Sequence, residues 1–575
     1  MALRVPQAGG PQLFKEGYKN LQGLEEVILR NIAATREMSE ITRTSFGPQG
    51  RNKMVVNHLG KLVVTSDAAT IIRELEVVHP AAKLLVMASQ QQEAEAGDGT
   101  NAVLIFGSEL LQRAEPLLRM GLHPSEIARG FDAALAAALE GLEGLAVDSV
   151  DSWTSRADVL KAVRSAVAAK QYGQDGLLAG LVADAVLAAM PGDSARFNVD
   201  NVRVVKVLGG SLAQSRVVRG MVFPTAPVTS ARRAQCVRVA VFACAVDVGQ
   251  TETKGTVLLR SADALLDYTR GEEAQMDAAV AELHAAGVGA VICGSGVGDL
   301  AIHSMNRYGM VAVKCPSKFE LRRVCRVVGA TALARLGAPT PEEMGYCDEL
   351  RTDEIGGDRV TVVRQWAADE ALGKKSEGVE RPGFASRVAQ SPLATVVLRG
   401  ATANALDDAE RALDDGVNVV KALTRDARLV PGACAAEMEL ARVVHGAADR
   451  TPGVAQHAMR AFAHALEVFA RTLADNAGVD STALVARLIA AHHSRDAAGV
   501  VGPNAGFDVE SEHEPRLVDA LKAGILDPLA VKLWALRYAT HAALTVLQVD
   551  QIVMAKTAGG PKLPKQQAAH WDTDD

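Results

Sequence analysis

The segment Glu93–Leu111, with the sequence EAEAGDGTNAVLIFGSELL, determines how the rest of the chain is interpreted. Its residues Gly97–Asn101 directly precede an apolar run in which Val103, Phe106 and Leu110 recur at helical spacing. This pattern predicts a glycine-rich turn that opens a buried helix. The first amide groups of a helix lack an intrahelical partner and carry the positive end of its dipole, so the turn is suited to bind an anion such as phosphate.

The acidic residue within this turn is compatible with bound phosphate only if a cation is present. Asp98 would repel phosphate unless a cation lay between them, and a hard, oxygen-seeking ion such as Mg²⁺ is the natural bridge. The alternative is a purely structural turn capped by Thr100, because short glycine-rich patterns are common. This segment alone favours neither interpretation, and the rest of the chain decides between them.

The composition predicts a soluble protein with large hydrophobic cores. A length of 575 residues suggests roughly three or four domains. The net charge of −7 and the absence of a basic run argue against nucleic acid as a partner. No run of eighteen apolar residues and no signal pattern is present, so we expect no membrane segment and a cytoplasmic location. The seven cysteines form no CxxC motif, which favours reduced, buried thiols.

The first quarter of the chain is mostly helical, with loops that carry polar and glycine residues. The loop at 42–53, TRTSFGPQGRNK, contains a Gly-Pro-x-Gly turn, and the runs 53–56 and 62–65 predict a β-hairpin. Asp67 follows this hairpin and either caps the next helix, expected at 69–74, or contributes a second carboxylate to a site that contains Asp98.

The middle of the chain alternates between strand and helix patterns, which predicts an α/β domain. Helices are expected first at 159–169 and 177–190, and a strand at 202–207. The predicted strands of the α/β region are 237–243, 288–293 and 310–314, and the predicted helices are 267–286, 297–308 and 317–328. The Gly-, Ser- and Pro-rich segment 373–392 predicts a flexible loop, and the tail after Met554 is expected to be disordered.

Several segments, in the same order over nearly the whole chain, resemble the group II chaperonins: TRTSFGPQGRNKM, TSDAAT, AGDGTN, AAKQYG, ETKGTVLL, ALDDGVNVVKALTRDARLVPG and VLQVDQIVMAK. The details DNVRVVKVLGG, VNHLGKL and EEMGYCDEL resemble one subunit type of the eukaryotic cytosolic ring. The resemblance implies an ATP-driven chaperonin that, with paralogous subunits, builds a hetero-oligomeric double ring around non-native polypeptides.

The resemblance also implies a multi-domain layout. A mainly α-helical equatorial ATPase domain would be discontinuous, an α/β intermediate domain would act as a hinge, and an α/β apical domain would bind substrate and carry a helical protrusion. The implied boundaries are 1–147 and 413–555 for the equatorial domain, 148–218 and 371–412 for the intermediate domain, 219–370 for the apical domain, and 556–575 for the tail.

The functional residues of the family map onto this sequence one by one. Asp98 would ligate Mg²⁺, Asp415 would orient the attacking water with the help of Asp67, and Lys170 would reach the γ-phosphate of ATP. Asp414 is the neighbouring alternative to Asp415, and only one of the two can face the phosphate because adjacent helical side chains project about 100° apart. The other implied nucleotide-binding residues are Phe46, Gly47, Pro48, Gly97, Gly99, Thr100, Asn101, Ala102, Ala168, Ala169, Gly432, Ala433 and Asp550, the last at the ribose.

One departure from the family pattern raises a second functional hypothesis. Relatives have three glycines after the proline at 431, whereas this chain has Gly432-Ala433-Cys434. If either replacement is held in a left-handed conformation, it costs about 1–2 kcal/mol and its side chain crowds the ribose. The alternative to an active ATPase is therefore a mainly structural ring subunit that binds nucleotide and hydrolyses or exchanges it poorly. A free-standing phosphotransferase is disfavoured, because the chain has no GxxxxGK[ST] loop or kinase signature.

Overall fold

The computed structural model describes residues 19–21, 24–57, 59–150, 152–247, 261–366, 393–494, 502–511 and 516–554. The expected loop at 373–392 and the tail at 556–575 lie outside these residues.

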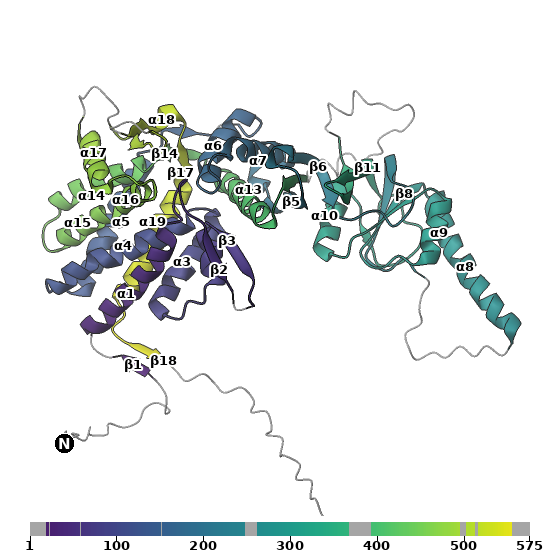
Figure 1. Ribbon diagram of the computed structural model, residues 1–575, viewed down its shortest axis with the longest axis horizontal. Coiled ribbons are helices and arrows are strands. Elements are labelled where there is room, and N and C mark those ends of the chain that lie inside the picture. Colours follow the sequence, from purple (N-terminus) through teal and green to yellow (C-terminus); the bar gives the residue numbers. More distant parts are fainter. Residues whose placement is uncertain are drawn as a thin grey trace, which may run out of the picture.

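A helical body takes its elements from both ends of the chain (Figure 1). Buried side chains between Ile28 and Leu142 and between Val430 and Leu547 form one continuous hydrophobic core. Its helices are α1 (Leu24–Arg43), α2 (Ala68–Glu74), α3 (Pro80–Ala96), α4 (Thr100–Arg119), α5 (Pro124–Glu143), α14 (Ala435–Arg450), α15 (Ala455–Leu466), α16 (Val468–Asn476), α17 (Ser481–His493), α18 (Ala520–Ala523) and α19 (Leu529–Leu547).

Helix α4 lies at the centre of this body, as its apolar sequence predicts. Its side chains from Val103 to Leu111 are almost entirely buried, and it packs against α1, α3, α15 and α19. Phe106 meets Phe462 edge to face, with 5.3 Å between ring centroids, and stacks on Phe469 at 5.8 Å. Each buried phenylalanine contributes about 1.5–3 kcal/mol, so these contacts join the N-terminal and C-terminal parts of the chain.

Short strands complete the helical body. The predicted hairpin is confirmed as β2 (Lys53–Val56) and β3 (Leu62–Thr65), which pair antiparallel. Strand β14 (Arg428–Pro431) lies between β4 (Asp148–Ser149) and β17 (Leu526–Pro528), and β15 (Ala505–Phe507) pairs with β16 (Leu517–Asp519). Near the chain ends, β1 (Lys19–Leu21) pairs antiparallel with β18 (Ile552–Met554).

A second core joins two stretches from the middle of the chain. The predicted helices are confirmed as α6 (Arg156–Ala168) and α7 (Asp175–Ala189), which pack on α13 (Ala403–Leu423) and on the parallel pair β5 (Val202–Leu208) and β13 (Ala394–Gly400). Gly416 lets α13 approach α6 and α7 closely, because a Cβ there would lie 3.0 Å from Val163 and 3.1 Å from Val182. Because α13 packs closely on α6 and α7 at Gly416, its rotation about its own axis is fixed there, and so is the direction in which the neighbouring side chains point.

The remaining strands confirm the α/β character predicted for the middle of the chain. Within the described residues, one nine-stranded sheet has the order β5-β13-β6-β12-β11-β7-β8-β9, with β10 beside β7. Its other strands are β6 (Arg216–Phe223), β7 (Arg233–Phe242), β8 (Val288–Cys293), β9 (Val311–Lys314), β10 (Ala332–Leu333), β11 (Gly345–Ile355) and β12 (Asp358–Arg364). The connecting helices are α8 (Ala262–Ala285), α9 (Asp299–Arg307) and α10 (Lys318–Val328), and α8 extends away from the sheet in Figure 1.

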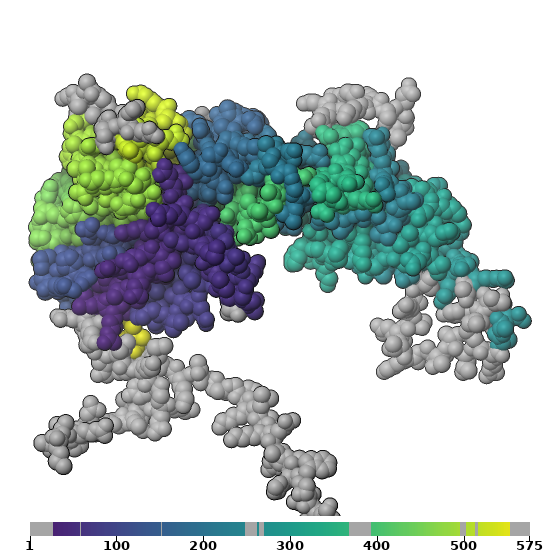
Figure 2. All heavy atoms as spheres, in the orientation of Figure 1, coloured from purple at the N-terminus to yellow at the C-terminus, as the bar shows by residue number. Residues whose placement is uncertain are grey.

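Figure 2 shows the consequence for the shape of the molecule. Purple, blue, green and yellow atoms, from both ends of the sequence, mix in one lobe, while the teal middle of the sequence forms another lobe. Among the described residues, no helix combines the length and apolar character that crossing a membrane requires.

Candidate active site

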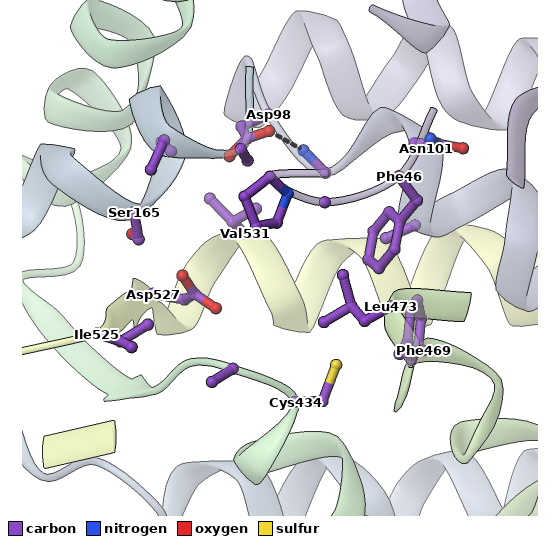
Figure 3. A pocket seen from close by; sticks show the side chains of 18 of the residues that line it. Phe46, Asp98, Asn101, Ser165, Cys434, Phe469, Leu473, Ile525, Asp527 and Val531 are labelled. Atoms are coloured by element: carbon purple, nitrogen blue, oxygen red, sulfur yellow. Dashed lines mark hydrogen bonds between the residues drawn. The ribbon is translucent and has the colours of Figure 1, made fainter. Parts of the chain in front are cut away.

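A cavity of about 490 Å³ lies in the helical body, within the size range of small-molecule sites. Its walls come from the loop after α1, the start of α4, the end of α6, the start of α14, the segment 507–510 and the start of α19. In Figure 3, Asp98 and Cys434 lie on opposite sides of this cavity, and Phe46, Phe469 and Leu473 gather at one end. Segments far apart in the sequence thus meet at one site.

Two glycines form the turn that brings the start of α4 to the cavity. Gly97 ends α3 with φ 71°, and Gly99 precedes α4 with φ 80°, both in the left-handed region that favours glycine. A Cβ on Gly97 would lie 2.1 Å from Asn418 Cβ, so the turn also packs directly on α13. Gly99, Thr100 and Asn101 line the cavity, which places the unpaired amides of a helix N-terminus at its wall.

Asp98 has one oxygen engaged and one available. Its Oδ1 accepts a hydrogen bond of 2.7 Å from the Gly99 amide, drawn as a dashed line in Figure 3. Among the described residues, no hydrogen bond to Oδ2 is present, and Asp98 lines the cavity. Burial raises the pKa of Asp98 above its usual value, although the positive charge of Lys170 opposes this shift. A second positive charge would stabilise the carboxylate.

Lys170 connects two further carboxylates to the same wall. Its Nζ lies 2.6 Å from Asp67 Oδ1 and 3.1 Å from Asp415 Oδ2, and its side chain is 15% exposed. Asp67 also caps α2, because its Oδ2 accepts hydrogen bonds from the amide and the hydroxyl of Thr70. The sequence offered two interpretations of Asp67, a helix cap and a second carboxylate near Asp98. The structure shows the cap and also places Asp67 beside Lys170. Asp67 and Asp415 lie just behind the cavity wall, and Lys170 lines it.

The electrostatics of this cluster favour a bound cation. Burial alone would lower the pKa of Lys170, but Asp415, Asp67 and Asp98 outweigh it and raise that pKa. Burial alone would raise the pKa of Asp67, but Lys170 and Thr70 hold it well below its usual range. Burial raises the pKa of Asp415 to about 8, against the opposing effect of Lys170. Three carboxylates thus share one ammonium group, and a divalent ion that prefers oxygen ligands fits this donor set.

Helix α13 presents only one of its two adjacent acidic residues to this cluster. Asp415 contacts Lys170, whereas Asp414 is exposed and its charged neighbours are Glu410, Arg203 and Lys206. The resemblance favoured Asp415 over Asp414, and Asp415 is the one of the two that lies beside Lys170.

The loop after α1 forms the apolar end of the cavity. Asn476 of α16 holds it, donating hydrogen bonds to the carbonyl oxygens of Arg43 at 3.1 Å and Phe46 at 2.8 Å. The ring of Phe46 lies 5.9 Å from that of Phe469. Gly47 has φ 81°, and a Cβ there would lie 2.1 Å from Leu473. A planar aromatic group of a ligand would find apolar contacts here.

Ala433 and Cys434 both adopt the left-handed conformation, with φ values of 55° and 63°. Cys434 directly precedes α14 and makes no side-chain capping bond, so it stands where glycine would be unstrained. Both side chains line the cavity. The Ala433 carbonyl accepts a 2.9 Å hydrogen bond from the Phe507 amide, which fixes the backbone. The strain expected for a left-handed residue at position 433 or 434 therefore applies to both Ala433 and Cys434.

Sequence reasoning missed a second charged cluster on the cavity floor. Lys532 forms ion pairs with Glu437 and, at 3.0 Å, with Asp527, and all three residues line the cavity. Burial would lower the pKa of Lys532, but Glu437 and Asp527 raise it above its usual value. The dipeptide Asp527-Pro528 before the apolar start of α19 is the signal that could have pointed to this cluster.

The other residues proposed from the sequence divide into three groups. Pro48, Ala102, Ala168 and Ala169 line the cavity. Gly432 supports its wall, because its amide donates a hydrogen bond of 2.9 Å to the Ile525 carbonyl. Asp550 does not belong to the site: it is exposed, lies outside the lining residues, and follows the far end of α19, whereas the start of α19 forms the floor.

A hydrogen bond links two parts of the wall that come from different regions of the sequence. The Tyr172 hydroxyl, in the connection from α6 to α7, donates to Glu510 Oε1 at 2.9 Å, and both residues line the cavity. Because α6 and α7 belong to the second core, this bond ties that core to the helical body.

Comparison with known proteins identifies the family to which the chain belongs. Residues 38–557 match the model of the TCP-1/cpn60 chaperonin family. Over 574 residues the chain is 51% identical to the "Probable T-complex protein 1 subunit theta" of Schizosaccharomyces pombe, with 100% of both chains covered. It is 46% identical over 575 residues to "T-complex protein 1 subunit theta" of Homo sapiens and 45% identical over 588 residues to that of Saccharomyces cerevisiae, again with 100% of both chains covered. The resemblance stated from the sequence is confirmed, and the subunit type that it indicated is theta.

Proposed function

Because the chain belongs to the TCP-1/cpn60 chaperonin family, we propose that it is an ATP-hydrolysing subunit of a hetero-oligomeric double ring that encloses non-native polypeptides. The ring would combine this chain with paralogous subunits and act in the cytosol. One observation carries the enzymatic part: Lys170, at the wall of the cavity, contacts both Asp67 and Asp415 close to the N-terminus of α4. Positive and negative groups of this kind position and neutralise a phosphoryl group during transfer.

The three hydrophobic regions support a division into domains. We assign the core shared by both chain ends to the equatorial domain, the core of α6, α7 and α13 to the intermediate domain, and the strands and helices from β7 to β12 to the apical domain. In this assignment α8 is the base of the helical protrusion. Helix α13 stays within the second core as far as Val420, so we move the proposed junction from residue 412 to the end of this helix.

The nucleotide would lie across the cavity with its phosphates at the glycine turn. The backbone amides of Thr100 and Asn101 would bind the phosphates, as helix N-termini do, and Gly99, which has no side chain, would let them approach the backbone. The base and ribose would then occupy the opposite part of the cavity, beside Phe46, Ala433 and Cys434.

Asp98 would hold a magnesium ion through the oxygen that points away from Gly99. Two features support a bound cation at this position. The carboxylates of Asp67, Asp98 and Asp415 outnumber the single ammonium group of Lys170, and burial raises the pKa of Asp98. When bound, Mg²⁺ would neutralise charge on the phosphate oxygens.

For hydrolysis, the chain would supply one base and one fixed positive charge. Asp415 Oδ2 faces Lys170, which leaves Oδ1 to orient a water molecule and to accept its proton as the water oxygen attacks the terminal phosphorus. The bond between that phosphorus and the bridging oxygen would break at the same time, so that ADP leaves with the bridging oxygen. Burial raises the pKa of Asp415, which makes its ionised form a stronger proton acceptor. Asp67 would hold the Lys170 ammonium in place, and Lys170 would stabilise the negative charge of the phosphoryl group.

The test is ATP binding and single-turnover hydrolysis by assembled rings in which this subunit carries Asp415→Ala. We expect the subunit to bind ATP and to fail to hydrolyse it. Unchanged single-turnover hydrolysis would reject the assignment of Asp415.

A second candidate function is a mainly structural subunit that binds nucleotide and releases it slowly. It is favoured by the left-handed Ala433 and Cys434, whose side chains occupy space at the wall that glycine would leave free. The rate of ADP release from this subunit separates the two functions: rapid exchange supports the ATPase cycle, and slow or absent exchange supports the structural role.

A further inference from the structure

A cluster of potential metal ligands lies outside the cavity, where α14, α15 and α16 meet. It consists of His445 on α14, His464 on α15, and Glu467, which joins α15 to α16. One ligand atom from each residue lies within 4.8 Å of the others. The centroids of the imidazole rings of His445 and His464 are 4.7 Å apart, and the rings meet edge to face. His464 Nδ1 lies 3.0 Å from Glu467 Oε1.

This geometry is close to that of a tetrahedral metal site. Bonds of about 2.0–2.1 Å place the ligand atoms of such a site about 3.3 Å apart, so the cluster has to contract by about 1.5 Å at most. The side chain of His464 is 50% exposed, which gives it room to turn, whereas Glu467 is 5% exposed. The exposure of His464 also leaves one side open for water as a fourth ligand.

The chemical types of the three ligands indicate which metal ion the cluster would bind. Two imidazoles and one carboxylate suit Zn²⁺ and its borderline neighbours, whereas Mg²⁺ and Ca²⁺ prefer oxygen ligands alone. His445 offers an imidazole nitrogen to this set from α14, and Glu467 offers a carboxylate oxygen.

The charges around the cluster balance. Arg471 donates a hydrogen bond of 2.7 Å to Glu467 Oε2, the oxygen that faces away from His464, in the way that outer groups commonly orient a metal-binding carboxylate. Arg460 is paired with Asp449 at 2.9 Å. Two arginines and two carboxylates cancel, so an approaching dication meets little net repulsion.

We propose that His445, His464 and Glu467 bind a zinc ion that ties α14 to α16. Both helices also reach the cavity, α14 through its first residues after Cys434 and α16 through Phe469 and Leu473. The ion would therefore fix the spacing of two elements that line the nucleotide pocket. This consequence rests on the proposed function, whereas binding of the ion does not.

The experiment is a titration of the full-length chain, freed of metal by a chelator, with Co²⁺ and then Zn²⁺. We expect one Co²⁺ per chain with tetrahedral visible absorption and without a thiolate charge-transfer band, because nitrogen and oxygen are its ligands. Zn²⁺ should displace the cobalt and raise the unfolding temperature. His445→Asn and His464→Asn should each weaken binding at least tenfold, and His457→Asn, an exposed histidine of the same helix α15, should bind as the wild type does.

The variants distinguish loss of a ligand from loss of folding. Because His464 is half exposed, His464→Asn should unfold at the wild-type temperature in the presence of a chelator. Equal affinity of the wild type and both variants would overturn the proposal, and so would a cobalt spectrum dominated by thiolate. These readouts do not involve ATP, so their failure would leave the ATPase assignment unaffected, and failure of the ATPase test would leave them valid.

Discussion

The Tyr172 hydroxyl and Glu510 Oε1 are 2.9 Å apart, although 338 positions separate them in the sequence. The bond joins the start of the second core to the C-terminal part of the helical body, and both residues line the cavity. A nucleotide in the cavity would lie beside elements that this bond holds together.

Tyr172→Phe should therefore accelerate nucleotide release. An exposed hydrogen bond of this kind contributes about 0.5–1 kcal/mol, which corresponds to a rate increase of about two- to fivefold. Stopped-flow release of a fluorescent ADP analogue measures this effect. Glu510→Gln should act in the same direction, and the double variant should add little to either change. Additive effects would show that the two side chains do not act through their shared bond.

Asp415→Asn should reduce single-turnover ATP hydrolysis by about 10²–10⁴-fold while ATP binding persists, because the amide cannot accept the proton of the attacking water. The adjacent Asp414→Asn is the matched control, since Asp414 is exposed and does not contact Lys170. Its hydrolysis rate should stay within about twofold of wild type. Quenched-flow measurement on assembled rings checks both, and equal loss in the two variants would contradict the assignment.

Gly97→Ala should destabilise the chain far more than Gly60→Ala. The two glycines have similar φ values, 71° and 75°, so the strain of a left-handed alanine, about 1–2 kcal/mol, is common to both. Only at Gly97 would the new Cβ meet another atom, Asn418 Cβ at 2.1 Å, whereas nothing lies within 4 Å at Gly60. Denaturant unfolding should show an extra loss of about 2 kcal/mol or more for Gly97→Ala. Equal losses would mean that α3 and α13 separate easily.

Ala433→Gly should stabilise the chain by about 0.5–1 kcal/mol, because it relieves a left-handed alanine at φ 55° while the greater freedom of unfolded glycine offsets part of the gain. Ala435→Gly is the control: it lies in the first turn of α14 with ordinary helical geometry and should lose stability. Nucleotide affinity should rise in Ala433→Gly alone. A loss of stability in both variants would show that the Ala433 methyl group contributes more by packing than it costs in strain.

Glu439→Gln should remove a stabilisation that depends on pH. Burial alone would raise the pKa of Glu439, but His492 and Arg442 lower it from 4.5 to about 2. A lowered pKa stabilises the fold fully above about pH 4.5 and loses this effect as the pH falls toward 2. The variant should therefore be about 2–3 kcal/mol less stable at pH 7, with the difference shrinking below pH 4.5. Denaturant unfolding at pH 7 and pH 3.5 measures it, and a difference independent of pH would indicate a packing effect.

The local parts of the site were predictable because their signals lie within a few residues. Glycines at 97 and 99 before an apolar helix indicated the turn, and Asp67 after a hairpin indicated a cap or a ligand. The positions of Lys170 and Asp415 came from resemblance to a family, because no local pattern brings together residues so distant in sequence.

Other parts depended on packing that the sequence does not display. Lys532 and Glu437 are 95 positions apart, and they pair because the first turns of α19 and α14 both lie at the cavity. Asp550 was misplaced because α19 continues to Leu547 and carries it about 27 Å along the helix axis from Leu529. The contact between His464 on α15 and His445 on α14 likewise depends on how two separate helices pack.

The shared core of the two chain ends has a consequence for synthesis on the ribosome. Helix α4 packs against α19, and about 400 residues must be translated between them, which takes roughly 20–80 s at 5–20 residues per second. Helices α1 and α3 can cover part of α4 during this interval, but the apolar surface of α4 that contacts α19 has no permanent covering in the nascent chain. A protein of a family that shelters incomplete folds is thus itself exposed to aggregation until α19 emerges.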